Sequence, residues 1–148
     1  MFVLATFAIP ICISDWRTRR IPNIYLIFML YLILAIRLFL PIKSIAVISA
    51  AALCAALLSV AGMGAGDAKL FVITALALNL PNFGALLLLA TSIYVAAILQ
   101  IILMGLYSRR LPKSIPLAFA IFSGSALYLA AAMSTSLRQY ADALANSW

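Results

Sequence analysis

The chain has 148 residues, of which 68% are hydrophobic and only 9% are charged, whereas an average soluble domain is about half apolar and about a quarter charged. It contains no histidine and no glutamate, which excludes catalysis by a histidine base and the common zinc and haem sites with histidine ligands. The composition therefore indicates an integral membrane protein. Its net charge of +7 indicates attraction to anionic lipid and not to nucleic acid, because the sequence has no basic segment interleaved with aromatic residues.

Long uncharged runs between small clusters of charge predict a single membrane-embedded domain over residues 1–148. The membrane-spanning helices are expected at about residues 1–15, 22–41, 44–62, 67–80, 84–106 and 114–133. Most of these runs are close to the roughly 20 residues that cross a bilayer as a helix. Turn-forming residues from Asn79 to Gly84 divide the longest run into two spans. The predicted fold class is all-α, a polytopic membrane protein with about six transmembrane helices.

The basic residues of the predicted loops favour one orientation in the membrane. The loops after the first, third and fifth spans carry Arg17, Arg19, Arg20, Lys69, Arg109, Arg110 and Lys113. The opposite side carries only Arg37, Lys43 and Arg138. The positive-inside rule therefore places the first group in the cytoplasm, with the N-terminus and the C-terminal tail outside.

The acidic residues are Asp15, Asp67 and Asp142. On this topology Asp15 closes the first span and Asp67 opens the fourth, so both lie at cytoplasmic helix ends and at one membrane depth. A charged carboxylate near hydrocarbon costs up to about 3 kcal/mol at a helix centre, which points to a functional use. As an alternative, Asp67 is a helix N-cap and Asp15 balances the nearby arginines.

Three glycines immediately precede Asp67. Gly62 and Gly66 have the small-xxx-small spacing that lets two helices pack closely. That packing does not need Gly64, and three glycines weaken a helix enough to favour a turn or an unwound end. An acid in such a segment can approach an extended peptide. If it lies close to Asp15, the two carboxyl groups share one proton, so that one activates water while the other donates to the carbonyl oxygen.

Two segments resemble a known family. Residues 64–67 read G-A-G-D, the G-x-G-D signature of intramembrane aspartyl proteases, and the continuation to Leu70 resembles the G-x-G-D-x-K-L form of type IV prepilin peptidases. The segment from Asp15 to Asn23, an acid followed after a basic stretch by I-P-N, resembles the first-aspartate segment of that family. Lys113 to Pro116 resembles a basic-to-proline stretch that the family often places before its last span.

The resemblance covers nearly the whole chain and implies an aspartic endopeptidase that needs no metal or cofactor. Asp15 and Asp67 would be its catalytic residues, and Gly64, Gly66 and Lys69 would belong to its active loop. The implied substrate is a prepilin-like membrane protein, with a short basic leader in the cytoplasm and a long apolar helix in the membrane, cut at their junction. The implied location is the inner (plasma) membrane, with the active site on the cytoplasmic side.

The resemblance is strongest to short members of the family. Bifunctional prepilin peptidases carry an N-terminal segment with paired C-x-x-C motifs and also methylate the processed pilin, whereas the cysteines here, Cys12 and Cys54, are isolated in separate apolar runs. The chain is more similar to the peptidases of tight-adherence (Flp-type) pilus systems, or to archaeal preflagellin peptidases. Its expected partners are the substrate and the lipid bilayer, and the sequence does not fix an oligomeric state.

Two other classes of protein stay open from the residues alone. A small proton-coupled membrane transporter would use Asp15 and Asp67 as a proton relay, although a relay usually places its acids nearer the membrane midplane. A structural assembly subunit would use Gly62 and Gly66 only for helix packing, and both aspartates would then be dispensable.

Overall fold

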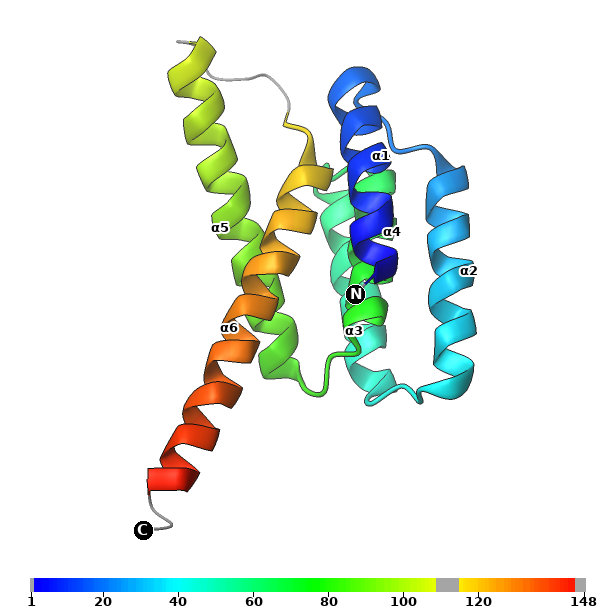
Figure 1. Cartoon of the computed structure of the whole chain (residues 1–148). Helices are drawn as coiled ribbons and strands as arrows, with labels where there is room; N and C mark the ends of the chain where they lie inside the picture. The colour runs from blue at the N-terminus through cyan, green and yellow to red at the C-terminus, as the bar shows by residue number, and fades with distance from the viewer. Residues whose placement is uncertain (1, 109–114, 146–148) are drawn as a thin grey trace.

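The computed structural model of the chain describes the backbone of residues 2–108 and 115–145. Within these ranges it contains six α-helices and no β-strand (Figure 1). The helices are α1 (Phe2–Thr18), α2 (Asn23–Phe39), α3 (Ile45–Val60), α4 (Ala65–Leu78), α5 (Phe83–Ser108) and α6 (Leu117–Ala145). The all-α class and six helices are confirmed for the described residues, and each helix overlaps one predicted span, while the crossing of the membrane by all six stays a prediction.

The helix ends differ most from the predicted spans where the chain becomes polar. α1 continues past Asp15 to Thr18, so Asp15 lies inside the last turn of the helix. α6 begins at Leu117 and continues to Ala145, well beyond the predicted end near residue 133. Apolar composition predicts only the part of a helix that contacts lipid, whereas backbone hydrogen bonding continues through polar residues that favour a helix.

The turn predicted between the fourth and fifth spans is confirmed. α4 ends at Leu78, and Asn79 caps it in the left-handed conformation with a φ of 53°. α5 then begins at Phe83, so Gly84 belongs to the helix and not to the loop. Part of the orientation argument rests on Arg109, Arg110 and Lys113, which lie outside the described residues.

α4 lies at the centre of the bundle. Most of its side chains between Ala68 and Leu76 are buried, and it packs against α2, α3 and α6. α1 packs against α2 and α6, whereas α5 packs mainly on α6. Successive helices run in opposite directions, so the upper end of the bundle in Figure 1 gathers the C-terminal ends of α1, α3 and α5 with the N-terminal ends of α2, α4 and α6. We call it the aspartate end, because it carries Asp15 and Asp67.

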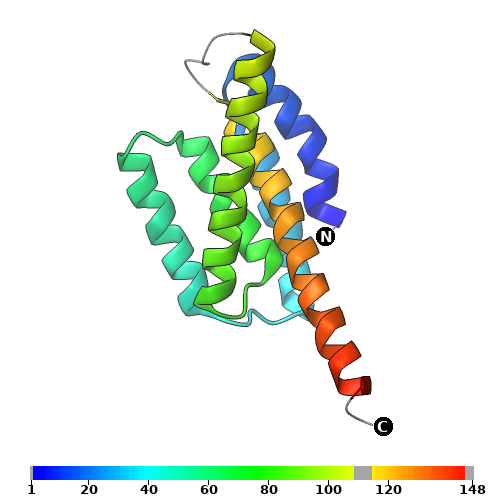
Figure 2. The same ribbon diagram turned by 90° about the vertical axis from the view of Figure 1, so that its left-hand side faces the viewer.

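A close contact joins α5 to α6, which lie against each other in both views (Figures 1 and 2). A Cβ atom added at Gly124 of α6 would lie 2.5 Å from the Cα atom of Ile93 on α5. Only glycine lets the two backbones approach so closely. Gly124 was not among the glycines for which the sequence indicated close helix packing.

The end of the bundle opposite the aspartates is held by polar contacts to the last turn of α4. The guanidinium group of Arg37 donates hydrogen bonds to the carbonyl oxygens of Leu76 and Ala77, at 2.9 and 2.8 Å. The last carbonyls of a helix lack the usual partners four residues on, although Leu76 also accepts a hydrogen bond of 3.2 Å from the N–H of Asn79, and a cation at this end is favoured by the helix dipole. The side chain of Asn79 donates to the carbonyl oxygen of Pro41 at 3.2 Å. Together these bonds fix α4 to α2 and to the α2–α3 loop.

Two of the described helices are long and apolar enough to cross a membrane. They are Phe83–Tyr107 of α5, with a mean hydropathy of 2.5, and Leu117–Thr135 of α6, with a mean hydropathy of 1.7. α2 and α3 are apolar but shorter. Among the described residues, large apolar side chains are exposed more often than they are buried, which is unusual for a protein surrounded by water. These features indicate a membrane protein.

Candidate active site

A polar cavity of about 310 Å³ lies at the aspartate end, between the end of α1, the α1–α2 loop and the start of α4. All the residues that the sequence analysis placed in the site line this cavity, namely Asp15, Gly64, Gly66, Asp67 and Lys69. The other lining residues are Arg19, Arg20, Ile21, Asn23 and Ala65. The carboxyl groups of Asp15 and Asp67 are close enough to interact electrostatically. The fold thus brings two acids from distant parts of the sequence to one cavity.

The Asp15 side chain is held at the N-terminus of α6. It is only 4% exposed, and its Oδ2 atom accepts a hydrogen bond of 3.0 Å from the backbone N–H of Ala118. The first N–H groups of a helix have no partner within the helix, and the helix dipole attracts negative charge to this end. This contact stabilises the ionised form of Asp15 relative to its neutral form. Arg19 also lies close enough to interact electrostatically with this carboxyl group.

The Asp67 side chain has a different environment. Its Oδ1 atom is buried and has no hydrogen-bond partner among the described residues. A buried polar atom without a partner costs about 1–3 kcal/mol, so such atoms are rare. Asp67 is not the N-cap of α4, since Gly64 occupies that position and no side chain caps the helix. The alternative that Asp67 serves only as a helix cap is therefore wrong.

A different structural constraint explains why glycine occupies each of the three positions before Asp67. Gly62 has a φ of +106°, a conformation that strains any residue with a side chain. A Cβ atom added at Gly64 would lie 2.9 Å from Oδ2 of Asp67. A Cβ atom added at Gly66 would lie 3.2 Å from the Cβ atom of Ile21. The predicted turn is confirmed, since α3 ends at Val60 and α4 begins at Ala65.

The helix-packing alternative for this segment is correct only in part. The Cβ position of Gly62 has no atom within 4 Å, so Gly62 takes part in no helix packing. Gly66 does allow a close approach, but to the α1–α2 loop and not to another helix. The glycines shape the loop between α3 and α4 and leave room for the Asp67 carboxyl group.

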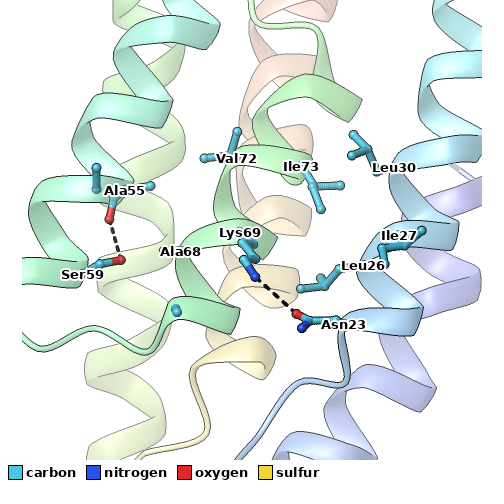
Figure 3. A pocket seen from close by; sticks show the side chains of 12 residues that line it. Asn23, Leu26, Ile27, Leu30, Ala55, Ser59, Ala68, Lys69, Val72 and Ile73 are labelled. Atoms are coloured by element: carbon cyan, nitrogen blue, oxygen red, sulfur yellow. Dashed lines mark hydrogen bonds between the residues drawn. The ribbon is translucent and has the colours of Figure 1, made fainter.

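Lys69 connects α4 to the first residue of α2. Its Nζ atom donates a hydrogen bond of 3.3 Å to Oδ1 of Asn23 (Figure 3). This pair stands at the border between the polar cavity and a neighbouring apolar cavity of about 640 Å³, which lies between α2, α3 and α4. Asn23 is the last residue of the I-P-N stretch, so the contact joins the two segments that resemble the family.

Sequence reasoning missed the residues that position the start of α6. Of the basic-to-proline stretch, Ile115 and Pro116 are described, and the carbonyl oxygen of Pro116 accepts a buried hydrogen bond of 3.0 Å from Nε2 of Gln100 on α5. This bond fixes the chain two residues before Ala118, the residue that donates to Asp15. The sequence did contain a signal for this contact: Gln100 is a lone amide within the apolar α5, and polar groups inside membrane helices are rarely without a role.

A metal ion at the site would need several ligand side chains close together. In the ranges that the structure describes, no group of three or more histidine, cysteine, aspartate or glutamate residues could hold a metal ion. The side chain of the third acid, Asp142, lies outside the described residues. The charged side chains that line the cavity are Asp15 and Asp67 with Arg19, Arg20 and Lys69.

The described part of the chain is all-helical, exposes much apolar surface and brings two carboxyl groups to one cavity, which is typical of a membrane protein with a functional site at one end of its helices. A family model described as the type IV leader peptidase family matches residues 2–108 of the chain. The chain therefore belongs to the type IV leader peptidase family, as its two motifs predicted, and has the general function of a prepilin leader peptidase. Neither the curated proteins nor the solved structures contain a significant match to it. The matched residues cover α1 to α5, so α6 and its contact with Asp15 lie beyond the match.

Proposed function

We propose that the chain is an aspartyl endopeptidase that removes the basic leader from type IV prepilin-like proteins, with Asp15 and Asp67 as its catalytic pair. The observation that carries the proposal is that both carboxyl groups line one cavity, while one oxygen of Asp67 is buried without a hydrogen-bond partner in the described residues. A water molecule or a substrate carbonyl group would supply that partner. The resemblance to short family members favours a pilin of the tight-adherence (Flp) type or an archaeal preflagellin as the substrate.

The different environments of the two carboxyl groups suggest different roles. Two neighbouring carboxyl groups do not both ionise easily, so the pair holds one proton. The N–H of Ala118 stabilises the ionised form of Asp15, and no comparable donor contacts Oδ1 of Asp67 in the described part of the chain. Asp15 is therefore the general base and Asp67 the general acid in this proposal.

The reaction then proceeds in two steps. In the first, Asp15 takes a proton from water as the water oxygen attacks the scissile carbonyl carbon, and Asp67 gives its proton to the carbonyl oxygen. In the second, the tetrahedral intermediate collapses, the leaving nitrogen takes the proton from Asp15, and Asp67 recovers a proton from the hydroxyl group. The C–N bond breaks, and the pair returns to its starting protonation. Gly64 leaves room for the Asp67 carboxyl group, Gly66 lets the α1–α2 loop approach α4, and Lys69 positions α4 against α2.

The proposed setting is a multi-pass protein of the plasma membrane, a single domain over residues 1–148 with the aspartate end in the cytoplasm. Arg17, Arg19 and Arg20 stand at the aspartate end, whereas Arg37 and Lys43 stand at the other end, as the positive-inside rule requires. The cut then takes place where a cytoplasmic leader meets an apolar segment in the membrane. The transporter alternative has no observation in its favour, because both carboxyl groups lie at one end of the bundle.

The experiment that tests the proposal is processing of a co-expressed prepilin, followed as a gel shift. Asp15→Asn and Asp67→Asn should each abolish processing while the protein stays inserted and folded, since asparagine has almost the same shape as aspartate. The double variant should be no worse than either single variant, because the two groups act as one unit. Asp142→Asn, on the predicted outer tail, is the matched control and should process normally. Cleavage by either single variant would refute the aspartyl mechanism.

A further inference from the structure

A third cavity, of about 740 Å³, begins at Gly64 and Asp67 on the opposite side from the Lys69–Asn23 pair. Its lining residues come from α3 and α5, with further walls from α4 and α6; the ribbons of these helices can be followed in Figure 2. We call it the α3–α5 groove. α3 and α5 make little contact with each other, so the groove is open along the side of the bundle.

The walls of the α3–α5 groove are almost entirely apolar. Leu87 and Tyr94 of α5 are 66% and 67% exposed, and Leu58 of α3 is also exposed. Asp67 is the one ionisable acid among its described lining residues, and it stands at the aspartate end of the groove. The same carboxyl group lines the polar cavity. Asp67 therefore stands at the border between a polar and an apolar cavity.

We propose that the α3–α5 groove binds the apolar segment that follows the cut in the substrate. The inference rests on the proposed function and extends it, since it assigns a binding site to one side of the scissile bond. A prepilin-like substrate changes from polar to apolar at the cut. A catalytic carboxyl group placed where a polar cavity meets an apolar groove matches that change, because each part of the substrate then meets a surface of its own polarity.

The length and direction of the groove agree with this occupant. Its α5 wall extends from Leu86 to Ala97, which corresponds to about 17 Å of helix and so to about 11 residues of a helical substrate. Leu86 lies near the start of α5, far from the aspartate end. A segment that begins at Asp67 and follows the groove therefore runs away from the proposed cytoplasmic side and into the bilayer.

Two matched substitutions, each replacing an alanine by tryptophan, test the groove. Ala90 of α5 lines it, whereas Ala126 of α6 lines a separate apolar cavity beside Trp16. Both alanines are exposed, so tryptophan at either position leaves the helix core intact. Ala90→Trp should raise the KM for a reporter with a full apolar segment about tenfold, because the indole ring occupies the site of that segment. Ala126→Trp should leave the KM unchanged.

A truncated reporter, which ends shortly after the cut, separates this inference from the proposed function. Ala90→Trp should cleave it as well as the wild type does. If the wild type cleaves neither reporter, the proposed function fails. If the wild type cleaves both and the two tryptophan variants behave alike, or if Ala90→Trp impairs the truncated reporter equally, the groove does not bind the apolar segment.

Cys54 gives an independent test, since it is exposed and lines the groove, whereas Cys12 lies on α1 away from it. The inactive Asp15→Asn variant would be mixed with reporters that carry one cysteine at successive positions after the cut, and disulfide formation would be driven by a mild oxidant. Cross-links to Cys54 should recur every three to four positions, as expected for a bound helix. Equal cross-linking to Cys12, no cross-linking, or dimers joined only through Cys54 would overturn the inference, and the last result would show a self-association surface instead.

Discussion

Gly64→Ala should separate catalysis from folding more cleanly than replacement of an aspartate. The added Cβ atom would lie 2.9 Å from Oδ2 of Asp67 and 3.7 Å from its Cγ atom, with no other atom within 4 Å apart from the chain neighbours. A real Cβ atom almost never lies so close to another heavy atom. The atom that has to move is the end of a flexible side chain, so the carboxyl group of Asp67 moves while the backbone stays in place.

The size of the effect follows from this geometry. Gly64 has a φ of −59°, which alanine adopts without strain, so the loss of stability is limited to the poorer N-cap, about 0.5–1 kcal/mol. Displacement of a catalytic group by about 1 Å can lower the rate about 100-fold. We therefore expect kcat to fall about 100-fold, with a Tm only a few degrees lower.

The assay compares prepilin cleavage and thermal unfolding for purified Gly64→Ala and for a matched control, Gly84→Ala. A Cβ atom at Gly84 would lie 3.4 Å from Oδ1 of Asn82, an ordinary contact in the first turn of another helix. The control should keep full activity. If Gly64→Ala cleaved as fast as the control, the position of the Asp67 carboxyl group would not limit catalysis, and the proposed role of Asp67 would be refuted.

Further predictions concern the supports of the site and its surroundings. Gln100→Leu removes the hydrogen bond that fixes the start of α6 and should lower kcat about tenfold at unchanged KM. The free energy of unfolding should change little, because the substitution also removes the Oε1 atom of Gln100, which is buried without a partner in the described part of the chain. Gly62→Ala should destabilise the protein by about 1–2 kcal/mol, measured by denaturation, since its φ is +106°; an unchanged stability would contradict the strain. EDTA should not alter the cleavage rate, and activity lost to EDTA and restored by zinc would contradict the two-aspartate mechanism. In a variant without the native cysteines, a cysteine at Thr18 should resist an impermeant thiol reagent added to intact cells, while one at Ile42 should react; the reverse pattern would place the site on the wrong side of the membrane.

The sequence predicted those features that depend on local composition. Uncharged runs predicted the six helices, and turn formers predicted the turn that begins at Asn79. The glycines predicted the break between α3 and α4, because weak helix formers act through their own backbone. The sequence placed Asp15 and Asp67 at one membrane depth but left open whether they meet, and the structure places both in the lining of one cavity. Their catalytic roles stay predictions until the variants are measured.

The features that the sequence did not predict depend on contacts between distant segments. The partner of Asp15 is the backbone N–H of Ala118, and a backbone donor leaves no mark in the sequence. Arg37 was interpreted only as a charge that sets orientation, although it also caps the last turn of α4. Gly66 fits its neighbour Ile21 through a loop contact that no periodicity reveals. In each case the residue type was visible, and its partner depended on the fold.

The carboxyl groups of Asp15 and Asp67 are held to different degrees, and this difference bears on their proposed roles. Asp15 is nearly buried and is fixed by α6, so its position depends on the packing of several helices. Asp67 lies in the first turn of α4, next to a glycine N-cap, and keeps one oxygen without a partner in the described residues. α4 itself is held at its far end by the hydrogen bonds from Arg37 to its last carbonyl groups. In the proposed mechanism, the firmly held Asp15 would act as the base, and the less constrained Asp67 side chain could align with an extended peptide and the attacking water.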